Sequence, residues 1–177
     1  MKIIISSILF GLSICTPGIF AEEEQTVLIT GSNRNIGLEF VKQFSNKGWK
    51  VIATTRSLDS ADELIEFSKQ NQNVVVEQLD ITNDDHLNNL KKKYKNDVID
   101  ILLNNAAYTP RYFSSFRGIG GVDIEATRKS FEVNSIGTMK VIQTFIDNVE
   151  RSKKGKIVNL STKAASFKER PEIPMMY

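Results

Sequence analysis

The sequence predicts an α/β protein with a doubly wound parallel sheet, and three observations lead to that class. Short apolar runs of strand length alternate with longer segments of helical period from Thr26 onward. The first of these runs is apolar nearly throughout rather than alternating, as expected for strands covered by helices on both faces. The 177 residues, 41% of them hydrophobic and 25% charged, suffice for one domain with a substantial core. Right-handed crossovers between parallel strands then favour a sheet in the order 3-2-1-4-5.

Each expected strand is a short apolar run bounded by polar or turn-forming residues. The five expected strands are Thr26–Thr30, Lys50–Thr54, Val74–Leu79, Val98–Leu103 and Lys156–Ser161.

Apolar residues at helical spacing place a helix after each of the first four strands. Gly48, a residue typical of a helix C-terminus, ends the first helix. The second is expected at about Asp59–Gln70 and the fourth from about Val122 to Val149. The residues expected to face inward are Ile36, Phe40, Val41 and Phe44 in the first helix, Ala61, Leu64 and Ile65 in the second, Leu87, Leu90 and Tyr94 in the third, and Phe131, Ile142, Phe145 and Ile146 in the fourth.

The first 21 residues have the pattern of a secretory signal peptide. Met1-Lys2 precedes an apolar run, then Pro17-Gly18, and Ala21 offers a small residue before the acidic stretch that begins at Glu22. The apolar run is too short to span a bilayer as a helix. We therefore expect an exported protein that starts at Glu22, with no membrane attachment after signal removal. The alternative is a misassigned start codon on a cytoplasmic protein.

Composition excludes several classes of function. The net charge of +2 and the mixing of acidic with basic residues argue against nucleic acid as a partner. Cys15 is the only cysteine and His86 the only histidine, so a thiolate metal cluster cannot form and no metal site is expected. A serine hydrolase is disfavoured because the sequence has no Gly-x-Ser-x-Gly turn. His86 is interpreted as part of a helix start.

The turn after the first strand is the first candidate site. Thr30-Gly31-Ser32-Asn33-Arg34-Asn35-Ile36-Gly37 leads directly into a helix. Glycine allows a tight turn, and a free helix N-terminus offers N–H groups to a pyrophosphate. A plain connecting loop would also need such a turn, so other motifs must decide.

Those motifs resemble the short-chain dehydrogenase/reductase family. The turn is similar to the family's Thr-Gly-x-x-x-Gly-x-Gly, with Asn35 in place of the middle glycine. Asn104-Asn105-Ala106-Ala107 is similar to the family's Asn-Asn-Ala-Gly, with Ala107 in place of glycine. The resemblance runs from Thr26 to Tyr177 and implies a Rossmann fold over residues 22–177. Leu38–Val41 and the spacing of Ser161, Thr162 and Ser166 are most similar to the C-factor and sniffer-like carbonyl reductases. The further matching segments, in chain order, are Asp80-Ile81, Asn104-Asn105-Ala106-Ala107, Phe131–Gly137 with Asn134, Ile157–Thr162, and Tyr177.

The resemblance implies hydride transfer between a nicotinamide and a small carbonyl or alcohol, with a tyrosine as acid–base group. The implied catalytic residues are Tyr177, Asn134 and a hydroxyl that is either Thr162 or Ser161. The implied cofactor-binding residues are Gly31, Asn33, Arg34, Ile36, Gly37, Arg56, Asp80, Ile81, Asn105 and Ala106.

The cofactor expected is NADP rather than NAD. An NAD-specific enzyme places an acidic residue after the second strand, whereas this chain has Thr55 and Arg56 there and Arg34 in the turn. Guanidinium groups suit a 2′-phosphate.

The family pattern continues with a lysine four residues after the tyrosine and with later strands, whereas this sequence ends at Tyr177. We therefore expect a fragment with incomplete catalytic machinery. Family members form homo-oligomers, which a fragment lacking the later strands is not expected to do. Two alternatives from other classes are a non-catalytic nucleotide-binding remnant and an exported interaction domain on the same scaffold.

Overall fold

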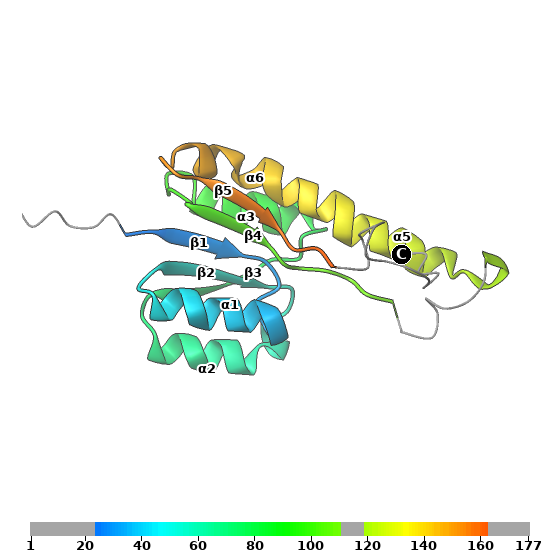
Figure 1. The fold of residues 1–177 in the computed structure, drawn as a ribbon, viewed down its shortest axis with the longest axis horizontal. Helices are drawn as coiled ribbons and strands as arrows, with labels where there is room; N and C mark the ends of the chain where they lie inside the picture. Colours follow the sequence, from blue (N-terminus) through cyan, green and yellow to red (C-terminus); the bar gives the residue numbers. More distant parts are fainter. Residues whose placement is uncertain (1–23, 111–118, 163–177) are drawn as a thin grey trace, which may run out of the picture.

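The computed structural model describes residues 24–110 and 119–162, and within them five strands form one parallel sheet (Figure 1). The strand order is β3-β2-β1-β4-β5, as predicted. The expected signal peptide and Tyr177 lie outside the described residues. The strands are β1 Thr26–Ile29, β2 Lys50–Thr55, β3 Val74–Gln78, β4 Ile101–Asn104 and β5 Lys156–Asn159.

Helices cover both faces of the sheet, which makes three layers. α1 and α2 lie on one face, and α3 and α6 on the other (Figure 1). Each face has its own apolar core: Val41 and Leu64 belong to the first, Leu87 and Phe145 to the second. The helices are α1 Asn35–Asn46, α2 Asp62–Gln70, α3 Asp84–Lys93, α5 Ile124–Phe131 and α6 Thr138–Glu150, with 3₁₀ turns η1 Leu58–Ser60 and η2 Ile119–Gly121 and a π-helical segment η3 Glu132–Gly137.

Helix α1 ends where the sequence predicts. Gly48 donates its N–H to Ser45 O at 2.9 Å and has a φ of +78°, a left-handed conformation that favours glycine at the end of a helix. The predicted inner face is correct for Val41, which is fully buried, but Ile36 is 63% exposed at the start of the helix. Leu38, at 4% exposure, is buried in its place.

The predicted long helix from Val122 to Val149 is wrong in its middle. It comprises α5, the π-helical segment η3 and α6. A π-helical turn contains more residues than an α-helical one and rotates the faces on either side of it. Phe131, expected inside, is 62% exposed for this reason, whereas Phe145, beyond the segment, is fully buried as expected.

Several element boundaries also differ from the prediction, most by one residue. The fourth strand begins at Ile101 rather than Val98, because the Ile99 N–H donates to Asn148 O of α6. The second helix is preceded by the separate turn η1, and the fifth strand ends at Asn159. None of the helices in residues 24–110 and 119–162 combines the length and apolar character needed to cross a bilayer.

Candidate functional site

A cleft of about 420 Å³ lies at the carboxyl ends of β1 to β4. This is where the strand order reverses between β1 and β4, the place at which open α/β sheets bind ligands. Every predicted cofactor-binding residue lines it: Gly31, Asn33, Arg34, Ile36, Gly37, Arg56, Asp80, Ile81, Asn105 and Ala106.

Two glycines let the backbone after β1 approach its neighbours closely. Gly31 has a φ of +68°, and a Cβ there would lie 2.8 Å from Ala106 Cα. A Cβ on Gly37 would lie 2.1 Å from Gly31 O and 2.6 Å from Asn105 Nδ2. Both distances are far below van der Waals contact, so neither position has room for a side chain in this geometry.

The loop after β4 fastens this turn to the sheet. Asn105 Nδ2 donates to Thr30 O at 3.0 Å and to Gly31 O at 2.8 Å. In return, Thr30 Oγ1 accepts the N–H groups of Asn105 and Ala106, both at 3.0 Å. These hydrogen bonds join two chain segments more than seventy residues apart and fix one wall of the cleft.

The N-terminus of α1 opens into the cleft without a side-chain cap. Arg34, the N-cap residue, makes no capping hydrogen bond through its side chain. The first N–H groups of α1 are then available to an anion, and the helix dipole favours negative charge there. Asn35 begins the helix at a φ of +49°, the only positive φ of a non-glycine residue in the described part of the chain.

Three ionisable side chains line the cleft among the described residues, Arg34, Arg56 and Asp80. Partial burial raises the pKa of Asp80, but hydrogen bonds from the Thr82 hydroxyl at 2.7 Å and N–H at 2.9 Å lower it. The nearby charge of Arg56 and the influence of His86 lower it further, so the pKa lies below its ordinary value. The carboxylate and two exposed guanidinium groups leave the cleft with net positive charge.

The predicted catalytic residues within the described part of the chain, Asn134, Ser161 and Thr162, do not line this cleft. Asn134 lies in the π-helical segment, where its Oδ1 accepts the Tyr108 N–H at 2.7 Å and its Nδ2 donates to Tyr108 O at 2.9 Å. Its carboxamide therefore ties the helix to the loop after β4. Ser161 and Thr162 follow β5 and are exposed. Tyr177 lies outside the described residues.

The predicted site residues did not include Thr30, which is buried and supports the cleft, or Asn35, which lines it. The Thr30 hydroxyl accepts hydrogen bonds from the loop after β4. The only sequence signal for this role is the position of Thr30 at the end of a strand and before a glycine. Asn35 lines the cleft in a glycine-like conformation. No group of three or more potential metal ligands occurs within the described residues.

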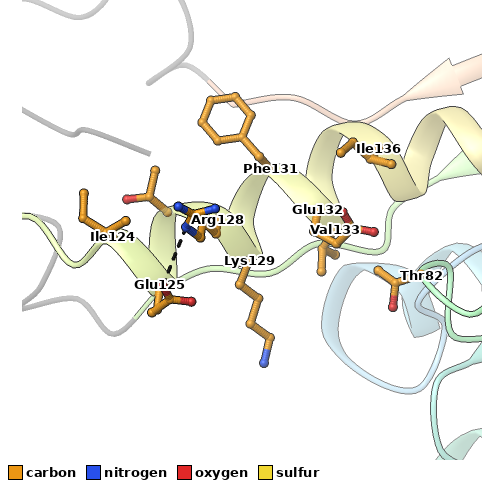
Figure 2. A pocket seen from close by; sticks show the side chains of 10 residues that line it. Thr82, Ile124, Glu125, Arg128, Lys129, Phe131, Glu132, Val133 and Ile136 are labelled. Carbon is orange, nitrogen blue, oxygen red and sulfur yellow. Dashed lines mark ion pairs between the residues drawn. The ribbon is translucent and has the colours of Figure 1, made fainter.

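A larger hollow of about 900 Å³ runs along α5 and η3 (Figure 2). Exposed apolar side chains, including Ile124, Phe131 and Ile136, line it together with a Glu125–Arg128 ion pair at 3.6 Å. It contains none of the predicted site residues. The smaller cleft is the better candidate because polar groups from four strand ends converge on it.

Comparison with known proteins agrees with this geometry. A family model described as short chain dehydrogenase matches residues 25–175. An uncharacterized oxidoreductase of Schizosaccharomyces pombe is 31% identical over 142 residues, covering 78% of this chain and 54% of that protein. Retinol dehydrogenase 8 of Bos taurus is 26% identical over 153 residues, covering 80% of this chain and 46% of that protein. The chain spans about half the length of the curated relatives it matches.

Solved structures share the fold. One described as a short-chain dehydrogenase/reductase of Burkholderia multivorans with bound NADP has a TM-score of 0.73 at 25% identity, covering 84% of this chain and 63% of that one. The NADPH-bound carbonyl reductase from chicken fatty liver has a TM-score of 0.71 at 23% identity and supports the fold alone.

Proposed function

The chain belongs to the short-chain dehydrogenase family, and from that premise we propose that it binds NADP(H) in the β1–β4 cleft and serves hydride transfer to or from a small carbonyl or alcohol. The observation that carries the proposal is the convergence of the turn after β1, an uncapped helix N-terminus and two arginines on one cleft.

The residues present fit a dinucleotide. Gly31 and Gly37 let the turn pack closely against Ala106 and against itself, which sets the backbone path that the family uses to hold a pyrophosphate. The open N-terminus of α1 supplies N–H donors to its oxygens. Asp80 uses Oδ1 to accept both Thr82 hydrogen bonds, and within the described residues its Oδ2 has no hydrogen-bond partner. That oxygen is suited to accept a hydrogen bond from the amino group of an adenine.

The choice of NADP over NAD rests on charge. Thr55 at the end of β2, with Arg56 and Ser57 after it, lines the cleft, and these residues offer no carboxylate to accept hydrogen bonds from the ribose hydroxyls of NAD. Arg56 and Arg34 can instead bind a 2′-phosphate through charge-assisted hydrogen bonds. The Burkholderia multivorans structure, which contains NADP, supports the same choice.

The catalytic assignment is part of the proposal. When bound, the nicotinamide supplies or accepts the hydride. Tyr177 would hold or release the proton at the substrate oxygen, and Thr162 or Ser161 would orient that oxygen. Asn134, whose side chain is held by Tyr108, would act by fixing the helix at the π-helical segment. Retinol dehydrogenase 8, which is similar to this chain, has a name that gives an alcohol as its substrate, and this supports a carbonyl or alcohol substrate here.

Titration of the full chain with NADPH and with NADH tests the cofactor assignment. Replacing Arg56 with alanine should weaken NADPH binding by about tenfold or more, because charge-assisted hydrogen bonds are worth about 1.5–3 kcal/mol. NADH binding should change little. Arg128→Ala on exposed α5 removes an arginine away from the cleft and serves as the matched control. Equal affinity for NADPH and NADH, unchanged in Arg56→Ala, would refute the assignment.

A further inference from the structure

His86, the only histidine of the chain, lies in the first turn of α3 and reaches back to the cleft. The N–H of Asp80 donates to His86 Nδ1 at 3.1 Å. His86 is half-buried, and its backbone N–H donates to Oδ1 of Asn83, the N-cap of α3, at 3.1 Å. Both ends of the contact are thus held in place.

This hydrogen bond satisfies a backbone group that the sheet cannot reach. β3 ends at Gln78, and the last sheet-like bond beyond it runs from the Leu79 N–H to Thr55 O at 2.8 Å. The next N–H, that of Asp80, has no strand of the described residues beside it, because β3 is the edge of their sheet. The imidazole nitrogen supplies the missing acceptor at the residue where the chain leaves the sheet and enters the cleft wall.

We propose that His86 is a positioning residue for the nucleotide site: its neutral imidazole accepts the Asp80 N–H and so holds the Asp80 carboxylate in its place in the cleft. The inference rests on the proposed function and names a residue that does not itself line the cleft. Protonation of Nδ1 replaces the acceptor with a second donor, which cannot accept the N–H.

Charged groups near this contact come from more than one element. Asp84 and Asp85 precede His86 in the first turn of α3, and the charge of Arg56, after β2, lowers the pKa of Asp80. Lys140 Nζ is paired with Asp84 Oδ1 at 3.0 Å. In the described part of the chain, His86 Nδ1 is the acceptor of the Asp80 N–H, and Asp80 Oδ1 is already engaged by Thr82.

The consequence is an affinity that depends on pH. Protonation of the imidazole removes the acceptor, so NADPH should bind about fivefold more weakly when His86 is protonated than when it is neutral, the loss expected for one backbone hydrogen bond. Because the 2′-phosphate of NADPH also changes charge, at about pH 6, NADH serves as a second probe without that group.

Variants of the full chain separate the imidazole from the phosphate. The His86→Asn variant carries an uncharged acceptor at the Nδ1 position, so it should rescue binding and abolish the pH dependence seen with NADH. The His86→Leu variant lacks an acceptor and should bind weakly at every pH. Asn89→Ala, on the exposed side of α3, is the matched control and should follow the wild-type profile. The amide resonance of Asp80 should shift with the same midpoint as the ring resonances of His86.

Two results would overturn the inference. One is a His86→Leu variant that binds NADH and NADPH with wild-type affinity at pH 8, and the other is an Asp80 amide resonance indifferent to pH. If the wild-type chain binds neither nucleotide at any pH, the proposed function fails first, and the Asp80 amide resonance alone decides whether His86 holds this turn.

Discussion

Replacing Gly37 with alanine should damage the turn after β1 more than any other single methyl group added to the cleft. The new Cβ would lie 2.1 Å from Gly31 O, whereas carbon and oxygen need more than about 3 Å, so the two segments must separate by about 1 Å. Neither side yields easily. Gly31 O is held by Asn105 Nδ2 at 2.8 Å, and Gly37 lies in the first turn of α1.

The magnitude follows from those contacts. Overpacking of this kind lowers the free energy of unfolding by about 1–3 kcal/mol. Weakening the hydrogen bond from Asn105 Nδ2 to Gly31 O in the variant should lower it by about 1 kcal/mol more. The free energy of unfolding should therefore fall by about 2–4 kcal/mol, a large share of the 5–15 kcal/mol typical of domains. With a urea dependence of about 2 kcal/mol per molar, the unfolding midpoint should move by about 1–2 M.

Urea unfolding of wild type, Gly37→Ala and Gly120→Ala measures this effect. Gly120 has no atom within 4 Å of an added Cβ and no left-handed backbone, so its variant should unfold like the wild type. NADPH binding by Gly37→Ala should also weaken, because the α1 N–H groups shift. A Gly37→Ala variant with the wild-type midpoint and wild-type affinity for NADPH would show that the close approach is not as described.

Two further predictions concern single side chains. Asn35→Ala should lower the free energy of unfolding by about 1 kcal/mol, because a left-handed backbone disfavours a Cβ, whereas Asn35→Gly should not lower it; equal urea midpoints for both variants would contradict this. Tyr94, only 5% exposed, donates its hydroxyl to Glu77 at 2.6 Å, so Tyr94→Phe should cost about 1–2 kcal/mol at pH 7. Burial, and then the hydrogen bond to Glu77 and the charge of Glu77, raise the pKa of Tyr94. The stability that wild type gains over Tyr94→Phe should therefore shrink as pH rises above about 10, where the tyrosine of the unfolded chain ionises. A difference in the free energy of unfolding that is the same at pH 7 and pH 11, measured with urea, would contradict this.

The sheet was predictable because its signals are local. Apolar runs mark the strands, and crossover handedness limits the order in which they pair. The turn after β1 was predictable for a similar reason, since Gly31 and Gly37 are required by backbone geometry that the motif records. The structure confirms the strand order, and it brings together the residues that were predicted to bind a cofactor.

The π-helical segment was not predictable from the same signals. Its geometry depends on contacts between distant segments: the Asn134 carboxamide binds the Tyr108 backbone, and Gly137 packs where a Cβ would lie 2.9 Å from Ile81 Cγ1. Helical periodicity assumes a constant number of residues per turn, so it placed Phe131 on the wrong face. The hydrogen bond between His86 and Asp80 was not predicted for a related reason, because it depends on the backbone conformation of the turn between them.

The two departures from the family's glycine pattern differ in their physical consequences. Ala107 stands where the resemblance expects glycine, but Asn35 is the only non-glycine residue with a positive φ among those described, so the backbone at Ala107 suits alanine without strain. Asn35 keeps the left-handed conformation that a glycine would adopt, and asparagine tolerates it better than most residues. The backbone path around the cleft is therefore preserved at both positions. In the turn after β1, Gly31 and Gly37 have no room for a Cβ in this geometry, and the sequence keeps glycine at both.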